Sequence, residues 1–200
     1  NGHKEHVPYI VGFAYYPDDP VYKTLFPDEP VYKTFAGDDC MSEFYDFLAT
    51  DEVKHIKYIN AYNGANFDHY YAFREKLNTL EKQGKFIMNN GQMLTAIVHK
   101  KKLWDLNRHI VGKLSQNLKG AGCVVSKGKL NHDLSTRWEE TSVWRQKKCR
   151  AYLKSDVLGL LELTEKMNNA VHEKWSINMY EYVTLSSMAN ALWERYYIPE

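Results

Sequence analysis

Two carboxylates, each close to aromatic residues and to an expected helix, are the best candidates for chemistry in this sequence. Asp68 follows a β-forming stretch that ends at the turn pair Asn63 and Gly64. Asp156 lies four residues after Tyr152, so a helix would place the hydroxyl and the carboxylate on one face. Carboxylate oxygens suit a hard divalent cation such as Mg²⁺. The alternative for each is structural, because an acidic residue in the first turn of a helix is stabilised by the helix dipole.

A strand followed by a helix, and one long helix, must position these carboxylates. The strand is expected over residues 56–62, and Asn66 is the expected N-cap of the next helix. The apolar and aromatic positions of that helix are Phe67, Tyr70, Tyr71, Phe73, Leu77 and Leu80. The long helix is expected over residues 141–175. Its expected buried stripe consists of Val157, Leu160, Leu161, Leu163, Met167 and Val171.

Strands and helices alternate through the rest of the chain, which predicts a mixed α/β sheet. Strands are expected at residues 7–15, 85–88, 93–99, 103–106 and, running into a loop, 123–132. Hairpin turns are expected at 89–91 and at 100–102, where lysines would lie at the tip. Further helices are expected at 38–48, capped by Asp38 or Asp39, at 108–118, ending at the glycines of 120–122, and at 185–197.

A tandem repeat of ten residues occupies positions 17–35. Each copy joins a Pro-Asp turn to the sequence Val-Tyr-Lys-Thr, which is typical of a strand. We therefore expect residues 17–36 to form a hairpin-like surface insertion. The acidic pairs beside the prolines are interpreted as turn residues in preference to metal ligands.

Composition indicates one ordinary globular domain spanning residues 1–200, 44% hydrophobic and 26% charged, with net charge +1. The charges are mostly acidic over residues 18–52 and mostly basic over 100–129, which is either a solvated face or a wall that follows phosphates. The three cysteines form no CxxC pair, so neither a disulfide framework nor a zinc site is indicated, and a reducing compartment is expected. No apolar run reaches transmembrane length.

Taken together, the two carboxylate motifs resemble those of a known family. The YNxxNFD element at residues 62–68 and the YxxxD element at 152–156 resemble, in this order, the second and third exonuclease motifs of family B DNA polymerases. The branch is the organellar and viral one, whose members use protein-primed replication, and the resemblance runs from about His6 to about Trp193. It implies the ribonuclease-H-like fold of 3′–5′ exonucleases, a mixed α/β sheet flanked by helices.

The resemblance also implies roles in a two-metal hydrolysis with Mg²⁺ or Mn²⁺. Asp68 would help to bind one metal and Asp156 the other, and Tyr152 would orient the attacking water. Residues 127–130, Lys-Gly-Lys-Leu, match a Kxxh pattern of protein-primed polymerases. Its lysine supports hydrolysis near the scissile phosphate, so Lys127 is the candidate here. The alternative for Lys127 is an ordinary surface lysine.

Contacts with the single-stranded 3′ end are implied for the second motif. Asn63 and Phe67 match the family positions that make such contacts, and Phe67 offers a ring for base stacking. The alternative for Phe67 is a place in the core. Tyr62 and Tyr71 are further candidates for the same strand. The serine-leucine motif of the family is not clean in this chain, since residues 105–108 occupy the nearest place.

The family's remaining two carboxylates belong to a DxE motif on the strand before the one expected at residues 7–15, and no such motif precedes Val7. We therefore expect a fragment that lacks the first motif and the polymerase palm and is inactive in isolation. The parent would be a DNA-directed DNA polymerase of protein-primed type, encoded by a virus, a mitochondrial plasmid or another mobile element. Its partners would be single-stranded or primer-template DNA and a terminal protein primer. The alternatives are a non-catalytic module that binds single-stranded DNA or a partner protein, and a stand-alone nuclease.

Overall fold

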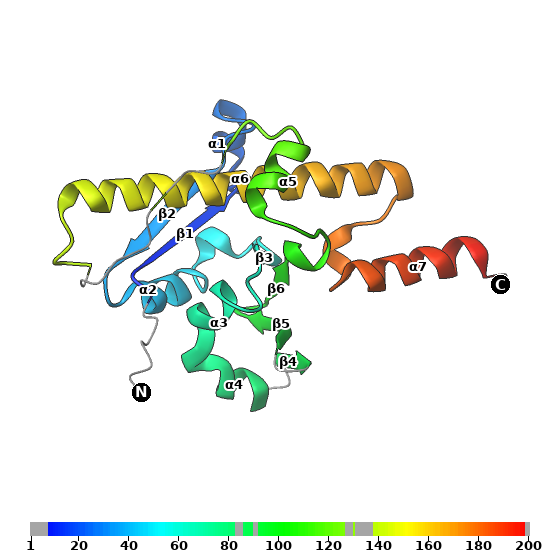
Figure 1. Cartoon of the computed structure of the whole chain (residues 1–200), viewed down its shortest axis with the longest axis horizontal. Coiled ribbons are helices and arrows are strands. Elements are labelled where there is room, and N and C mark those ends of the chain that lie inside the picture. Colours follow the sequence, from blue (N-terminus) through cyan, green and yellow to red (C-terminus); the bar gives the residue numbers. More distant parts are fainter. Residues whose placement is uncertain (1–7, 83–85, 90–91, 127–129, 131–137, 199–200) are drawn as a thin grey trace.

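Two small β-sheets surrounded by helices make up the computed structural model, which describes residues 8–82, 86–89, 92–126, 130 and 138–198 (Figure 1). In the first sheet, β1 (Ile10–Tyr15) pairs antiparallel with β2 (Val31–Ala36). The order of the second sheet is β3 (Tyr58–Ala61), β6 (Lys101–Asp105), β5 (Gln92–Val98) and β4 (Phe86–Asn89). Strands β3 and β6 run parallel and the other pairs antiparallel, so the expected mixed α/β architecture with a mixed sheet is confirmed.

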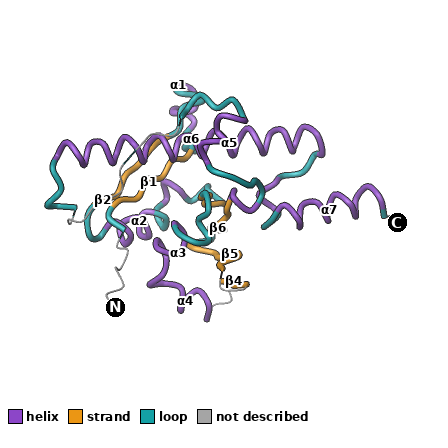
Figure 2. The backbone as a smooth tube through the Cα atoms, viewed as in Figure 1, coloured by secondary structure: helices purple, strands orange, loops and turns teal. Residues whose placement is uncertain are grey.

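Helices lie on both sides of these strands (Figure 2). They are α1 (Pro20–Leu25), α2 (Cys40–Phe47), α3 (Asp68–Phe73), α4 (Leu77–Lys82), α5 (Leu114–Gly120), α6 (Val143–Trp175) and α7 (Leu185–Tyr197). The longest, α6, packs against β1 and β2 in its first part and against α5 further along. The sequence predicted α6 to within two residues, and α7 with the bounds observed.

Two hydrophobic clusters lie on opposite sides of β6, because successive side chains of a strand point to opposite faces. Leu103 belongs to the cluster that contains Ile59, while its neighbour Trp104 belongs to the one that contains Leu163 of α6. The first cluster also receives residues from α2, α3 and β1. The second receives residues from α5 and α7. Both faces of β3 and β6 are therefore packed, so the loops that follow these two strands start from well-anchored ends.

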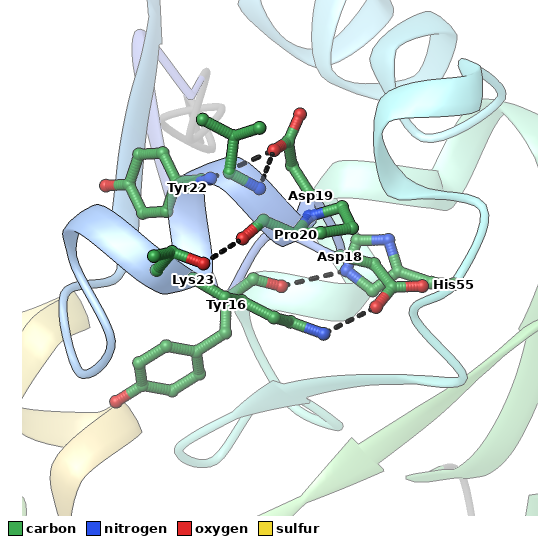
Figure 3. Close-up of polar contacts among 9 residues, drawn as sticks. Tyr16, Asp18, Asp19, Pro20, Tyr22, Lys23 and His55 are labelled. Carbon is green, nitrogen blue, oxygen red and sulfur yellow. Dashed lines mark hydrogen bonds and ion pairs between the residues drawn. The ribbon is translucent and has the colours of Figure 1, made fainter.

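The two copies of the repeat adopt different secondary structures although both contain Pro-Val-Tyr-Lys-Thr. The first copy forms α1, so the strand prediction was wrong there, and the second forms β2, where it is confirmed. In the first copy, Asp19 Oδ1 accepts hydrogen bonds from the backbone N–H groups of Val21 (2.7 Å) and Tyr22 (2.9 Å) and so caps α1 (Figure 3). Glu29 occupies the equivalent position of the second copy, and glutamate is not among the preferred N-cap residues.

Tertiary context decides the rest of this difference. The backbone of β2 pairs with β1 over its whole length, and Val31 and Phe35 pack against the first hydrophobic cluster. Helix α1 has no buried residue, and local bonds hold it, including an ion pair of 2.6 Å between Lys23 and Asp18 (Figure 3). The repeat is thus not a plain surface hairpin: only its first copy protrudes, while its second copy is part of the core.

Several expected helix ends differ from those observed. Asn66 is not the N-cap of α3; Phe67 holds that position, and Asn66 Nδ2 donates instead to Asn63 Oδ1 at 2.7 Å. The helix expected to continue to Leu80 is interrupted by a 3₁₀ turn at Arg74–Lys76. Asp39 is at the N-cap of α2, but its side chain makes no capping hydrogen bond.

The segment after β6 also differs from the prediction. A 3₁₀ turn at Leu106–Arg108 comes first, and α5 begins only at Leu114, after Gly112 with a φ of 110°. A left-handed backbone at Gly112 cannot continue a helix, which explains the late start. Residues 123–126 form no strand, contrary to the prediction, and their bends lead to residues 127–129, which lie outside the described part of the chain.

The hairpin between β5 and β6 is confirmed, but its lysines are not all at the tip. Lys100, with a φ of 65°, is in the turn, whereas Lys101 is only 3% exposed. Its Nζ donates to the carbonyl of Leu48 at the end of α2 (2.9 Å), where the helix dipole favours a cation. Burial lowers the pKa of Lys101. Lys101 is therefore a structural residue and no part of a phosphate-binding wall.

Candidate functional site

A cavity of about 1130 Å³ separates the two sheets. All six residues of β1 and all four of β3 line it, and α6 contributes Tyr152, Leu153 and Asp156. Within the described residues, β1 pairs only with β2 and β3 pairs only with β6. The cavity therefore lies between two strand edges that have no strand partner.

The motif residues predicted from the sequence surround this cavity. Seven of the eight line it: Tyr62, Asn63, Phe67, Asp68, Tyr71, Tyr152 and Asp156. The eighth, Lys127, lies outside the described residues. The structure thus brings the element at residues 62–71 and the element at 152–156 to one place, although more than eighty residues separate them in the sequence.

The acidic residues present match the chemistry of a magnesium or manganese site only in part. Asp68 is in the first turn of α3, as predicted, and Asp156 is in the middle of α6. Carboxylates are the right donors for hard divalent cations. However, the part of the chain that the structure describes contains no group of three or more His, Cys, Asp or Glu side chains placed to hold an ion. Two carboxylates are fewer than a two-metal site needs.

Asp105, at the end of β6, holds the loop that carries the first of these motifs. Its Oδ1 accepts the backbone N–H of Asn63 (2.8 Å) and of Asn107 (3.0 Å), and its Oδ2 accepts that of Ala65 (3.1 Å). The parallel pairing of Ala61 with Asp105 puts this carboxylate level with the end of β3. Asp105 is only 5% exposed, so these are buried bonds to a charged group.

The loop itself has a conformation that few residues tolerate. Asn63 has a φ of 63°, in the left-handed region where asparagine is enriched. A Cβ on Gly64 would lie 2.5 Å from the Cβ of Ala61 and 2.9 Å from His69 Nδ1, so only glycine fits. The Asn-Gly turn predicted from the sequence is therefore required by packing as well as by backbone geometry.

Two buried histidines flank Asp105. Burial lowers the pKa of both His69 and His109 to about 4, and the nearby carboxylate of Asp105 opposes this shift. The ring of His109 stacks on that of Trp104 with centroids 4.5 Å apart. His69 also lines the cavity, and its Nε2 has no hydrogen-bond partner among the described residues. Both side chains are uncharged at neutral pH.

The aromatic candidates have different environments. Phe67 is 55% exposed, so the alternative of a core residue is wrong, and its ring is available at the cavity. Tyr62 is tied to the start of α5, since its hydroxyl donates to the Gly112 carbonyl (2.6 Å) and accepts from Asn117 Nδ2 (2.7 Å). The hydroxyl of Tyr62 is thus used in the fold, which leaves Phe67 as the better stacking surface.

Sequence reasoning missed two acidic residues that matter here. One is Asp105, which stood out only as the single acidic residue of a basic segment at the end of a strand. The other is Glu165 of α6, which also lines the cavity and accepts a hydrogen bond from the hydroxyl of Tyr16 at 2.9 Å. Burial raises the pKa of Glu165. Its position nine residues after Asp156 gave no signal, because the two do not share a helix face.

The known proteins that are similar to this chain belong to one class. The family model of DNA polymerase type B, organellar and viral, matches residues 123–200, which include Tyr152 and Asp156. The resemblance expected from the two motifs is thereby confirmed: the chain is similar to the type B DNA polymerases of organelles and viruses.

One particular relative supports the same class. A protein of Agaricus bitorquis described as a probable DNA polymerase is 24% identical in an alignment that covers 73% of this chain. The aligned part is 23% of that protein, so the chain spans about a quarter of its relative's length. No solved structure matches the chain. Among the described residues, no helix has the length and apolar character needed to cross a membrane.

Proposed function

We propose that this chain is the 3′–5′ exonuclease domain of a type B DNA polymerase of the organellar and viral kind, which removes nucleotides from single-stranded 3′ ends during DNA replication. One observation carries this proposal: two motif elements that are far apart in the sequence line one cavity beside the ends of β3 and β6. The family match to residues 123–200 supports the polymerase as the parent protein.

The cavity also supports the ribonuclease-H-like fold. Neighbouring strands in a sheet lie about 4.8 Å apart, and an inserted strand could pair with both β1 and β3. Such a strand would join the two sheets into one, in the order β2-β1-strand-β3-β6-β5-β4. We propose that the DxE segment expected in the parent protein provides this strand. It would add its two carboxylates to Asp68 and Asp156 and complete the set of four.

Each of the candidate site residues would then have a defined role. Asp68 and Asp156 would hold the divalent metals, which supply an activated water and stabilise the leaving oxygen when they are bound. Tyr152, one helical turn before Asp156, would orient that water. The exposed ring of Phe67 would stack on a base of the 3′ end, beside Asn63. Lys127 would support hydrolysis near the scissile phosphate.

A titration with paramagnetic Mn²⁺, followed by NMR line broadening, tests the metal site without relying on activity. We expect broadening of amides in residues 63–71 and 152–157, and its loss in the Asp68→Ala, Asp156→Ala double variant. The control is Asp46→Ala, Asp51→Ala, which removes two other exposed carboxylates outside the cavity. Broadening that is confined to other regions, or that persists in the cavity variant, would contradict the proposed site.

Hydrolysis is tested in a longer form of the protein that includes the proposed DxE segment. With Mg²⁺ and a single-stranded oligonucleotide, Asp68→Asn and Asp156→Asn should each reduce the rate at least a hundredfold. If that longer form binds DNA but hydrolyses none, the domain is a non-catalytic binding module. The incomplete ligand set among the described residues is the observation that keeps this second function in view.

A further inference from the structure

The first half of α6 is strongly basic. Between Val143 and Ser155 it contains five cations and no carboxylate. The cations are Arg145, Lys147, Lys148, Arg150 and Lys154. Acidic residues reappear in the helix only from Asp156 onward, and the nearest ones before it are Glu139 and Glu140.

This distribution is the reverse of what stabilises a helix. The N-terminal end of a helix carries a partial positive charge, so carboxylates are favoured there and cations are disfavoured. The first turn of α6 has no acidic residue, and Ser142 caps the helix, since its Oγ accepts the N–H of Arg145 at 3.4 Å. The dipole acts within the first turn, so it disfavours Arg145 there and does not stabilise the cations from Lys147 onward. Helix stability therefore does not explain them.

Three of the cations share one exposed face. Lys147, Arg150 and Lys154 are related by steps of three and four residues and span about 10 Å along the helix. In the part of the chain that the structure describes, none of the three has an acidic partner within ion-pair distance. Instead, Arg150 lies over the ring of Trp138 (5.5 Å) and Lys154 over that of Tyr32 (5.8 Å).

This face is separate from the cavity. Lys147, Arg150 and Lys154 do not line the cavity, while Tyr152 does. Two residues along a helix correspond to a rotation of about 200°, so Lys154 and Tyr152 point in nearly opposite directions. In Figure 1 the first half of α6, drawn in yellow, runs past β1 and β2 at the outside of the molecule.

An exposed aromatic ring accompanies the cations. Trp144 is 66% exposed, and Lys148 Nζ lies 3.9 Å from its ring centre. A row of cations combined with an exposed ring is how proteins bind single-stranded nucleic acid, where the cations contact phosphates and the ring stacks on a base. An anionic membrane would also favour cations beside an exposed tryptophan, so the similarity to DNA polymerases is the observation that favours a nucleic acid.

We propose that residues 144–154 of α6 bind single-stranded DNA, with Lys147, Arg150 and Lys154 on the phosphates and Trp144 stacked on a base. This surface is distinct from the cavity carboxylates, so it does not depend on hydrolysis there. It would guide the strand along the outside of the domain.

Fluorescence anisotropy with a labelled oligo-dT in EDTA tests this surface in the absence of any metal. In the triple variant Lys147→Gln, Arg150→Gln, Lys154→Gln, the slope of log affinity against log salt concentration should decrease in magnitude by about 2, because three phosphate contacts contribute about 0.7 each. Affinity at low salt should fall at least tenfold. The matched control is the triple variant Lys54→Gln, Lys57→Gln, Lys174→Gln, which removes the same charge from exposed positions elsewhere and should leave the slope unchanged.

Two further arms separate the possible ligands. Trp144→Ala should weaken oligo-dT binding about tenfold while keeping the salt slope. Circular dichroism confirms that each variant is folded. The proposal is overturned if the α6 variant keeps the wild-type slope, if the control loses as much, or if duplex DNA or phosphatidylserine vesicles bind more tightly than oligo-dT through the same residues. Because the assay is run in EDTA and measures binding alone, its outcome does not depend on hydrolysis at the proposed active site.

Discussion

Replacing Asp105 with asparagine should destabilise the loop that carries Asn63 and Asp68 far more than its small change in shape implies. The carboxylate makes three buried hydrogen bonds to backbone N–H groups, two through Oδ1 and one through Oδ2. An asparagine can keep its amide oxygen at the Oδ1 position. Its NH₂ group must then face the N–H of Ala65, where two donors meet.

The size of the effect follows from these bonds. The N–H of Ala65 would be left buried without an acceptor, at a cost of about 1–3 kcal/mol. The bonds from Asn63 and Asn107 would lose their charge assistance, at about 0.5–1 kcal/mol each. The total is a loss of about 2–5 kcal/mol in the free energy of unfolding. Asp105→Ala, which removes all three acceptors, should cost more.

Urea unfolding at pH 7 measures the loss, and amide hydrogen exchange locates it. Exchange should accelerate at Asn63, Ala65 and Asn107 before it does in the rest of the fold. Asp51→Asn is the control, because its side chain is 94% exposed and makes only a surface ion pair, so it should change stability by less than about 0.5 kcal/mol. A loss below about 0.5 kcal/mol in Asp105→Asn, with unchanged exchange at the three amides, would refute the reasoning.

Two other predictions follow from the fold. His69 and His109 have folded-state pKa values of about 4, below the ordinary value of 6.5, so their contribution to stability is present above pH 6.5 and is lost as the pH falls toward 4. The loss should reach on the order of 3 kcal/mol for each histidine. The urea midpoints at pH 7 and pH 4.5 should differ less in the double variant His69→Gln, His109→Gln than in the unsubstituted protein, and an equal difference would contradict this. Asp19→Ala should remove the cap of α1, at a local cost of about 1 kcal/mol, and NMR chemical shifts should report less helix over residues 20–25. The control is Glu29→Ala, at the same position of the second copy, which should leave β2 intact. Unchanged shifts in α1 would show that the cap is not needed.

Local signals explain most of what the sequence predicted correctly. Helix α7 has a capping box in which Thr184 and Ser187 bond reciprocally, and such short-range chemistry is visible in sequence. The hairpin between β5 and β6 was predicted with a turn at residues 100–102, and Lys100 lies in the observed turn. The motif residues around the cavity were predicted because the two elements resemble those of a family, not because any local rule brings them together.

The features that were missed depend on distant contacts. Asp105 holds a loop forty residues earlier in the chain, and only the parallel pairing of β3 with β6 shows that it can. Lys101 is in a run of lysines that looks solvated, yet it is buried, because a carbonyl at the end of α2 accepts a hydrogen bond from its Nζ. The two copies of the repeat have almost the same intrinsic preference, and pairing with β1 decides which one becomes a strand.

The duplicated segment also shows how this chain could lengthen without losing its register. Tyr15 pairs with Val31, so fifteen residues, 16–30, connect β1 to β2. Without one ten-residue unit, five residues would remain, a length that ordinary β-hairpin loops have. The duplication therefore amounts to the expansion of a single hairpin loop. The copy that does not pair with β1 folds on itself as α1, which leaves an external site where sequence can be gained or removed at little cost to the core.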